Sequence, residues 1–396
     1  MNIVYLGIID ISAEAAETRH VLETCEAWNK LGHVVTLFVP NMDGKHSQRL
    51  GIQIVKMQTL RLKKSFLLTI MYNMVSIFYL LKHFSSKRID IVYTRQSMLE
   101  FITLFFMKRL GVRYIAEVNG IDSEQKRLYG MAEWKIWLSE SLHGMCYGLA
   151  DAIVTVTDEI RGYLADRYPE TKEKTYVVSN GANVEVSRPI KKADACRELG
   201  FDPDKIYFVF VGSLKKWHGI ENAILSIERL IRQEANIMLL VIGDGPERGD
   251  LESMVARKGL ERNVTFVGKV KYSRVPLYIG TATACLALFD RARNDRTGLS
   301  PLKIFEYMAC GKPVVTTDVG NLINIIGHHE CGVIVKPGDI DAMSEALMNL
   351  MRNPELSKKL GGNGREAAVK HYSWGVISEK LLDIMYVAEK RRKAKN

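Results

Sequence analysis

The sequence lacks several patterns that define common classes of protein. Its six cysteines lie far apart, without a CxxC pair and without a cysteine–histidine spacing that suits zinc. We therefore expect small buried thiols in a reducing compartment and no metal site. No GxGxxG fingerprint follows the first predicted strand, where the sequence reads GIIDIS. This absence disfavours a dinucleotide-dependent oxidoreductase.

Membrane-spanning and secretory segments are also missing. The uncharged run from Ser65 to Leu81 is slightly shorter than the about 18 to 20 residues that span a bilayer, and it contains Asn73. The amino terminus, MNIVYLGIIDIS, has neither the basic region nor the cleavage site of a signal peptide and is typical of a first β-strand. We expect the protein to reside in the cytoplasm.

Positive charge is in excess, with a formal net charge of +10. Such a balance favours an anionic partner: nucleic acid, an acidic membrane face or a phosphorylated substrate. No nucleic-acid recognition motif supports the first of these. Lysines and arginines flank both the run from Ser65 to Leu81 and a second apolar segment, SMLEFITLFFMKRLG. Basic charge beside apolar surface predicts peripheral contact with the anionic inner face of the cell membrane.

Short β-branched segments alternate with helix-length segments along the chain, which predicts parallel sheets with crossover helices. The first series of strands is NIVYLGI, HVVTLFVP, IQIVKM, IDIVYT, VRYIAEV, AIVTVT and TYVVSN, and the second is IYFVFVGS, NIMLLVIGDG, NVTFVGKV, ACLALFD, KPVVTTDVG and CGVIVKPG. A polar segment with two prolines separates the series and predicts a linker at 184–204. The predicted fold class is therefore α/β, with two Rossmann-like, doubly wound domains at 1–183 and 205–373. Ligands are expected at the carboxyl ends of the strands, in a cleft between the two halves.

The segment SPLKIFEYMACGKPVV, from Ser300 to Val315, contains the strongest candidate site. Pro301 fits the first position of a helix that Gly311 ends. The free amides of the first turn favour an anion such as phosphate, and Lys303 in that turn adds positive charge. Glu306, one turn later, can accept hydrogen bonds from a ribose diol. An ordinary amphipathic crossover helix with Lys303 and Glu306 exposed explains the pattern equally well.

A second candidate site lies in the first half, at the carboxyl edge of the predicted strand VRYIAEVN. Glu117 and Asn119 fall at this edge, where polar side chains can contact a ligand. Asn119 and Gly120 are equally typical of a plain turn.

The segment from Ser300 to Val315 resembles the signature of the family 4 glycosyltransferases (glycosyl transferases group 1) of GT-B fold, in which a glutamate motif runs into AMACGxPVV. Seven further segments resemble landmarks of this family in the right order: RHVLETCEAWNKLGHVVTLFVP, DAIVTVTDEIRGYL, VVSNGANVEVSRP, FVGSLKKWHGIENAI, VIGDGPERGDLESM, VTFVGKV and HYSW. The resemblance covers almost the whole chain. It implies a GT-B fold whose C-terminal helix and basic tail, 374–396, return to the N-terminal acceptor-binding domain.

The resemblance also implies roles for individual residues. It implies that Glu306 binds ribose, that the start of the helix holds the diphosphate, and that Val267 and Gly268 lie beside the base. The implied donor-binding residues are Gly212, Ser213, Lys215, Lys216, Gly243, Val267, Gly268, Ser300, Pro301, Leu302, Lys303 and Glu306. The implied catalytic residues are Asn119 as a sugar contact, Glu117 for orientation of the acceptor, and Lys303 for charge on the leaving group.

The chain departs from the family pattern at positions that concern the donor. Gly298 stands where the first glutamate of the motif is expected, although Asp295 is close in sequence. Ser213 and His218 replace a usual arginine and lysine, so the intervening Lys215–Lys216 pair is expected to supply the charge. These changes affect the identity of the donor sugar more than the class of reaction.

The function implied by the resemblance is a retaining glycosyl transfer from a nucleotide-sugar donor, with no cofactor and no obligatory metal. UDP is the preferred nucleotide and GDP the alternative. The expected acceptor is a lipid-linked molecule or a glycan in the synthesis of cell-surface polysaccharide or glycoconjugate. Two other functions remain open: a nucleotide-sugar epimerase on the same fold, and a non-catalytic protein that binds nucleotide sugars.

Overall fold

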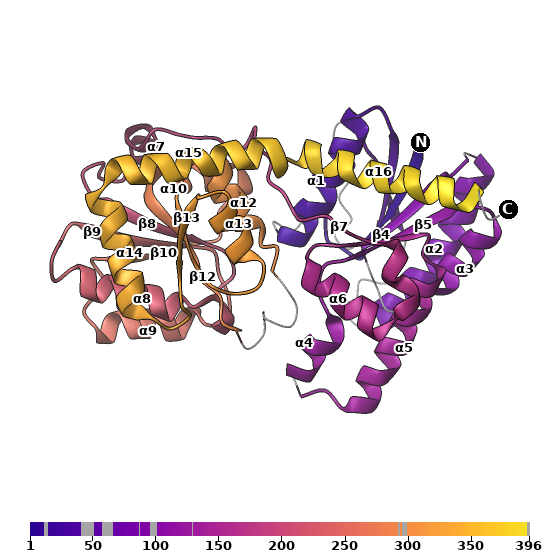
Figure 1. Ribbon diagram of the computed structural model, residues 1–396, viewed down its shortest axis with the longest axis horizontal. Helices are drawn as coiled ribbons and strands as arrows, with labels where there is room; N and C mark the ends of the chain where they lie inside the picture. Colours follow the sequence, from indigo (N-terminus) through magenta and orange to yellow (C-terminus); the bar gives the residue numbers. More distant parts are fainter. Residues whose placement is uncertain are drawn as a thin grey trace. The chain divides into compact units, whose positions relative to one another are not determined.

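The computed structural model describes residues 1–11, 15–40, 51–57, 66–86, 88–95, 101–128, 130–291, 294 and 299–393 (Figure 1). The chain forms two compact units. Unit 1 comprises Met1–Ser179 and Trp374–Asn396, and unit 2 comprises Asn180–Ser373. Within the described ranges, no helix is both long enough and apolar enough to cross a membrane.

Unit 1 is built on a parallel sheet of seven strands in the order β3-β2-β1-β4-β5-β6-β7. The strands are β1 (Asn2–Leu6), β2 (Val34–Pro40), β3 (Gln53–Met57), β4 (Ile91–Arg95), β5 (Arg113–Val118), β6 (Ala152–Thr155) and β7 (Thr175–Val177). The helices are α1 (Ala16–Lys30), α2 (Phe66–Ser86), α3 (Phe101–Arg109), α4 (Asp122–Leu128), α5 (Glu133–Leu149), α6 (Asp158–Arg167) and α16 (Trp374–Lys393). The strand order reverses between β1 and β4, and ligands of open α/β sheets bind at the carboxyl ends of strands at such a point.

The two faces of this sheet are covered by different helices. One face carries a core that includes buried side chains of α2, α3 and α5. On the other face, Tyr5 of β1 and Tyr93 of β4 pack against Trp28 of α1, with ring centroids 5.0 to 6.2 Å apart. Helix α16 packs beside α1 in the same unit (Figure 1). Glu117 of β5 belongs to this second face, because its carboxylate meets the Tyr5 hydroxyl.

Unit 2 is built on a parallel sheet of six strands in the order β10-β9-β8-β11-β12-β13. The strands are β8 (Ile206–Val211), β9 (Ile237–Ile242), β10 (Val264–Gly268), β11 (Ala282–Ala287), β12 (Val314–Thr317) and β13 (Gly332–Val335). The α-helices are α7 (Lys192–Leu199), α8 (Ile220–Leu230), α9 (Arg248–Arg257), α10 (Val275–Thr281), α12 (Leu302–Ala309), α13 (Leu322–His328), α14 (Ile340–Arg352) and α15 (Pro354–His371). The strand order reverses between β8 and β11.

Alternate side chains of β8 show how this sheet separates two cores. Tyr207 and Val209 join the core with α10, α12, α13 and α15, whereas Phe208 and Phe210 join the core with α8, α9 and α14. Successive side chains of a strand point to opposite faces, so a strand covered on both faces reads as a continuous hydrophobic run. IYFVFV is such a run, and Figure 1 shows α8, α9 and α14 together on one side of the sheet.

The predicted fold class, α/β with two Rossmann-like parallel sheets, is confirmed, and each predicted strand segment overlaps an observed strand. All six cysteines are free and buried, as expected. The interpretation of 184–204 as a linker is not what the structure shows, because this segment contains α7, which packs against α10 within unit 2. Helix α7 buries only the small side chains Ala195 and Cys196, so its sequence looks as polar as a linker.

Candidate functional site

At the carboxyl ends of β8 and β9 in unit 2, the backbones of the two strands lie in direct contact. Gly212 follows β8 with φ 147°, and Gly243 follows β9 with φ 127°, both in a region that favours glycine. The Gly212 amide donates to the Ile242 carbonyl at 2.9 Å, and the Gly243 amide donates to the Gly268 carbonyl at 2.8 Å. A Cβ at Gly243 would collide with the Gly212 carbonyl oxygen. Gly243 therefore has a structural reason to be glycine, independent of any ligand.

Lys303 lies at the same strand ends, in the first turn of α12. Its side chain is 9% exposed, and a Cβ at Gly212 would lie 2.6 Å from its Nζ. The ammonium sits 4.1 Å from the ring centroid of Phe210 and 5.6 Å from that of Phe289. It has no hydrogen-bond partner in the part of the chain that the structure describes. Burial lowers the pKa of Lys303 to about 7, against the opposing effect of the Glu306 carboxylate.

The alternative of an ordinary helix with an exposed Lys303 and Glu306 is therefore wrong. Glu306 is 3% exposed, and every residue of α12 from Lys303 to Ala309 is buried. Helix α12 packs against the sheet on one side and α15 on the other, so it has no solvent face for charges to occupy. Its charged residues need another explanation than solubility.

The turn before α12 is fixed by a residue that the sequence did not single out. Asn180 donates from its backbone amide to Ser300 Oγ at 2.9 Å and from Nδ2 to the Ser300 carbonyl at 2.6 Å. Pro301 has an extended ψ of 123° and precedes the helix, which begins at Leu302. The expectation that Pro301 is the first helical residue is thus wrong by one position, because the turn that Asn180 holds stays extended through Pro301. Asn180 belongs to the asparagine–glycine pair of VVSNGANVEVSRP, which is the only signal it left in the sequence.

Tyr307 of α12 is a second residue that the sequence analysis missed. Its hydroxyl accepts a hydrogen bond from the Val211 amide at 2.7 Å and donates to the Leu286 carbonyl at 3.3 Å. Val211 and Leu286 belong to β8 and β11, where the strand order reverses. Tyr307 thus ties α12 to the point of the sheet where a ligand is expected.

The remaining donor-binding candidates of unit 2 lie in the loops around this point. Lys215 and Lys216 are exposed, and the Lys215 ammonium lies 4.9 Å from the ring centroid of Trp217. His218 holds their loop through its Nδ1, 2.5 Å from the Ser213 carbonyl oxygen. No described contact brings either lysine to Lys303.

Val267 lies in an irregularity of the edge strand β10, where the pairing with β9 shifts between Phe266 and Gly268. In a bulge of this kind two residues of one strand face one residue of its partner, and Val267 has no register partner on β9. Gly298 and Asp295, which the sequence analysis discussed, lie outside the described residues.

The candidates of unit 1 form a compact polar cluster at the ends of β4 and β5. Glu117 is 2% exposed, and its carboxylate accepts hydrogen bonds from Tyr5 at 3.3 Å and from Asn119 Nδ2, and pairs with His20 Nε2 at 2.6 Å. Burial by itself would raise the pKa of Glu117, but the His20 imidazole, the Arg95 guanidinium and the hydrogen bond from Asn119 outweigh it and lower that pKa to about 2. Glu117 is therefore an ionised, buried group, and its contact with a ligand would be indirect.

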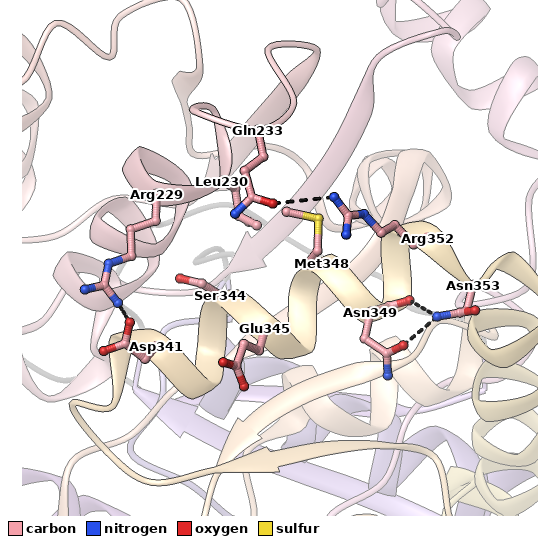
Figure 2. Close-up of a pocket in the computed structure, with 10 residues that line it drawn as sticks. All are labelled: Arg229, Leu230, Gln233, Asp341, Ser344, Glu345, Met348, Asn349, Arg352 and Asn353. Atoms are coloured by element: carbon pink, nitrogen blue, oxygen red, sulfur yellow. Dashed lines mark hydrogen bonds and ion pairs between the residues drawn. The ribbon is translucent and has the colours of Figure 1, made fainter.

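Two further features bear on the location of a site. Among the described residues, no group of three or more His, Cys, Asp and Glu side chains is arranged to hold a metal ion. A groove of about 490 Å³ between α8 and α14 is large enough for a small molecule, but its walls are helices and not strand ends (Figure 2). Its two arginines have partners within the groove, since Arg229 pairs with Asp341 and Arg352 donates to Gln233. The groove is therefore not part of the candidate site.

Comparisons with known proteins place this geometry in a family. The family model described as Glycosyl transferases group 1 matches residues 191–367, and the model described as Glycosyltransferase Family 4 matches residues 18–186. The curated α-maltose-1-phosphate synthase of Mycobacterium tuberculosis is 27% identical over 253 residues, which cover 59% of this chain and 62% of that protein. The chain thus spans less than two thirds of the length of this relative.

Solved structures share the fold over the whole chain. Sucrose-phosphate synthase from Thermosynechococcus elongatus superposes with a TM-score of 0.79 at 18% identity, covering 100% of both chains. Anabaena HepE, solved in complex with UDP, superposes with a TM-score of 0.73 at 13% identity, covering 98% of this chain and 100% of that chain. Together with the two family models, which adjoin along the sequence, these matches show that the chain belongs to the family 4 (group 1) glycosyltransferases of GT-B fold.

Proposed function

We propose that this protein is a retaining glycosyltransferase that moves a sugar from a nucleoside diphosphate sugar, preferably a UDP-sugar, to a lipid-linked or glycan acceptor. The observation that carries the proposal is Lys303: a buried ammonium without a hydrogen-bond partner among the described residues, at the start of a helix. A buried cation is costly unless an anion accompanies it. A diphosphate at the start of α12 supplies that anion, and the free amides of the first turn add to the attraction.

Unit 2 offers the parts that a nucleotide-sugar site needs. The turn that Asn180 fixes before α12 presents the first amides of the helix, and Lys303 stands beside them under Gly212. Glu306, one turn further on, offers a carboxylate for a ribose diol. As the bond to the sugar breaks, negative charge develops on the leaving diphosphate, and a fixed ammonium with fixed amides stabilises it without reorganisation. On this proposal no metal is obligatory.

The preference for UDP rests on the fold neighbour that was solved with UDP. We propose to test it with a thermal-shift panel of UDP-sugars and GDP-sugars, since a ligand that binds only the folded state raises its stability with concentration. We expect a UDP-sugar to shift the melting temperature most, and an equal shift with a chelator present. No shift with any member of the panel contradicts the proposed function. Formation of free sugar from the donor without acceptor distinguishes a transferase from a protein that only binds the donor.

The acceptor proposal rests on three helices of unit 1 that expose apolar side chains. Helix α3 packs against both α2 and α5, so the three are contiguous. Their exposed apolar side chains recur at helical spacing: Met74, Phe78 and Leu81 on α2, Ile102, Phe105 and Phe106 on α3, and Trp134, Trp137, Leu138 and Met145 on α5. We call this set the apolar face of unit 1. Soluble proteins seldom leave such a contiguous surface uncovered.

Cations border the apolar face of unit 1 on each helix. Lys82 of α2 is exposed, the Arg109 guanidinium lies 4.9 Å from the Phe105 ring centroid, and the Lys135 ammonium lies 5.5 Å from that of Trp134. Exposed tryptophans with neighbouring cations suit the headgroup level of an anionic bilayer. We propose that unit 1 rests on the anionic face of a membrane, where a lipid-linked acceptor is available.

Sedimentation with vesicles of anionic and of neutral lipid tests the membrane contact. We expect binding to anionic vesicles that weakens with salt, because surface charge attraction is screened within about 8 Å at physiological ionic strength. Phe78→Ser combined with Trp137→Ser should reduce binding, whereas Ile323→Ser, at a similarly exposed apolar residue of unit 2, should not. Equal binding of all these variants, or none by the unsubstituted protein, would rule the contact out.

A further inference from the structure

The polar cluster of unit 1 makes more contacts around Glu117 than a sugar contact at Asn119 alone requires. Its centre is Glu117, whose carboxylate accepts hydrogen bonds from Tyr5 and Asn119 and pairs with His20, three residues from separate parts of the chain. Tyr5 comes from β1, His20 from α1 and Asn119 from the residues just after β5. His20 is itself held edge-on against Trp374, with ring centroids 5.1 Å apart. The carboxylate is therefore held from β1, from α1 and from the residue just after β5.

The charge state of Glu117 decides which way the Asn119 side chain faces. The pKa of Glu117 is lowered to about 2 against the effect of its burial, so the carboxylate stays ionised at neutral pH. An ionised carboxylate can only accept hydrogen bonds. The amide of Asn119 must then turn its Nδ2 toward Glu117 and its Oδ1 away.

The atom turned away has no use within the protein. Asn119 Oδ1 is buried and lacks a hydrogen-bond partner among the residues that the structure describes. Arg95, whose backbone pairs with Glu117 in the register of β4 and β5, likewise has an Nη1 without a partner in those ranges. Buried polar atoms without partners are rare in folded proteins and call for an explanation. One acceptor and one donor at neighbouring strand ends match a hydroxyl group, which donates to one and accepts from the other.

We propose that Glu117 is a positioning residue that acts through Asn119: it fixes Oδ1 as a hydrogen-bond acceptor that, with Arg95, takes a hydroxyl of a carbohydrate substrate. This inference rests on the proposed function for the identity of the ligand as a carbohydrate. It changes the expected role of Glu117, since the carboxylate sets the direction of a neighbouring amide and does not itself meet the acceptor.

The proposal predicts that the effect of a change at Asn119 depends on the residue at position 117. Asn119→Asp keeps an acceptor oxygen but places a second carboxylate against Glu117, so the new side chain must turn away or take up a proton. Transfer activity, as kcat/KM, should fall by about tenfold or more, which is within the usual coupling energy of contacting residues. In the Glu117→Gln background, the amide introduced at position 117 can donate to the carboxylate introduced at position 119. The same Asn119→Asp substitution should then cost less than about threefold.

Controls distinguish the loss of this positioning from a general loss of activity or of UDP binding. Asn183→Asp is the matched substitution, because Asn183 Oδ1 accepts hydrogen bonds from the backbone amides of Glu185 and Val186, and an aspartate oxygen can accept the same two bonds. It should leave activity unchanged. The affinity for UDP, measured by calorimetry, should be equal in all variants of the cycle, since the residues proposed to bind the nucleotide belong to unit 2. Equal losses from Asn119→Asp in both backgrounds, or no loss in either, overturn the proposal.

A second measurement does not depend on turnover. In an amide nitrogen–proton NMR spectrum, the Asn119 side-chain NH₂ should show a proton shifted by its hydrogen bond and protected from exchange, and Glu117→Leu should abolish both. Fast exchange in the unsubstituted protein overturns the positioning role even if a variant of the cycle fails to fold. If the NMR result holds and no donor is turned over, the proposed function has failed and the role of Glu117 has not.

Discussion

Replacing Lys303 by methionine should make the protein more stable and its donor binding weaker. Methionine is close in length and flexibility to the lysine stem, so it can keep the packing over Phe210 and under Gly212. What it removes is a positive charge that is 9% exposed and has no hydrogen-bond partner among the described residues. In the free protein this charge is a liability, and the proposed function gives it a use only when an anion is bound.

The burial of Lys303 gives the size of both effects. Burial lowers the pKa of Lys303 from 10.5 to about 7. A shift of this size corresponds to roughly 5 kcal/mol of unfavourable interaction in the charged form, before any relaxation. Replacement of buried charge by apolar groups usually recovers about 1 to 4 kcal/mol, and we expect a gain in the free energy of unfolding in that range. Loss of a charge-assisted hydrogen bond to the diphosphate costs about 1.5 to 3 kcal/mol, or roughly 10- to 150-fold in affinity.

Chemical denaturation at pH 7 and calorimetric titration with UDP measure the two effects on the same samples. Lys312→Met is the matched control, because Lys312 lies close in sequence and its Nζ donates to the Gly280 and Ala282 carbonyls at 2.9 and 2.8 Å. Its loss leaves both carbonyls unpaired, so this variant should be less stable and should bind UDP normally. If Lys303→Met lowered stability and left the affinity for UDP unchanged, Lys303 would be a structural lysine like Lys312 and its assignment to the diphosphate would be wrong.

Three further results are expected. First, the affinity for a UDP-sugar, measured by calorimetry, should fall as pH rises from 6 to 8.5, because the ammonium of Lys303, with its pKa lowered to about 7, loses its proton in this range; Lys303→Met should remove the pH dependence. Second, Glu117 has a pKa lowered from 4.5 to about 2, so its stabilising effect should be fully present above pH 4.5 and lost as pH falls toward 2. Denaturation curves should therefore show Glu117→Gln destabilised by about 3 kcal/mol at pH 7 and much less near pH 2, whereas a constant difference would contradict this. Third, Tyr307→Phe removes the hydrogen bonds to Val211 and Leu286 and should lower the free energy of unfolding by about 1 to 3 kcal/mol, with a weaker effect for Tyr386→Phe at an exposed tyrosine.

The strands could be predicted from sequence because hydrophobic runs carry the information by themselves. IYFVFV is buried on both faces of unit 2, and such a run admits few other structures. The segment 184–204 is the opposite case, because it has no hydrophobic run to indicate its helix. Its helix α7 buries little apolar area, so polarity and proline suggested a linker where the structure has a packed helix. Hydrophobic periodicity therefore predicts a helix or strand well only where that element buries many apolar side chains.

The candidate site could be predicted only in part, for a related reason. The sequence singles out residues by their type: Lys303 and Glu306 by their charge at a helix start, Glu117 and Asn119 by their place at a strand end. Residues that position other residues could not be predicted. Nothing in VVSNGAN indicates that Asn180 fixes Ser300, and nothing in the sequence of α12 indicates that Tyr307 joins two strands. The hydrogen bonds of Asn180 to Ser300 and of Tyr307 to Val211 join residues 120 and 96 positions apart in the chain. Spacing rules cannot reach contacts of that length.

Both candidate sites share one physical feature that ordinary folding rules disfavour. Unit 2 buries an ammonium with no hydrogen-bond partner in the described residues, and unit 1 turns a buried amide oxygen outward from an ionised carboxylate. Each arrangement leaves a buried polar atom without a partner among the described residues, which costs free energy in the protein without a ligand. Departures of this kind are expected where a protein gives up stability to keep a group in the orientation that a ligand needs. The two sites differ in chemistry, since unit 2 offers a buried cation to an anion, whereas unit 1 offers one acceptor and one donor to a hydroxyl.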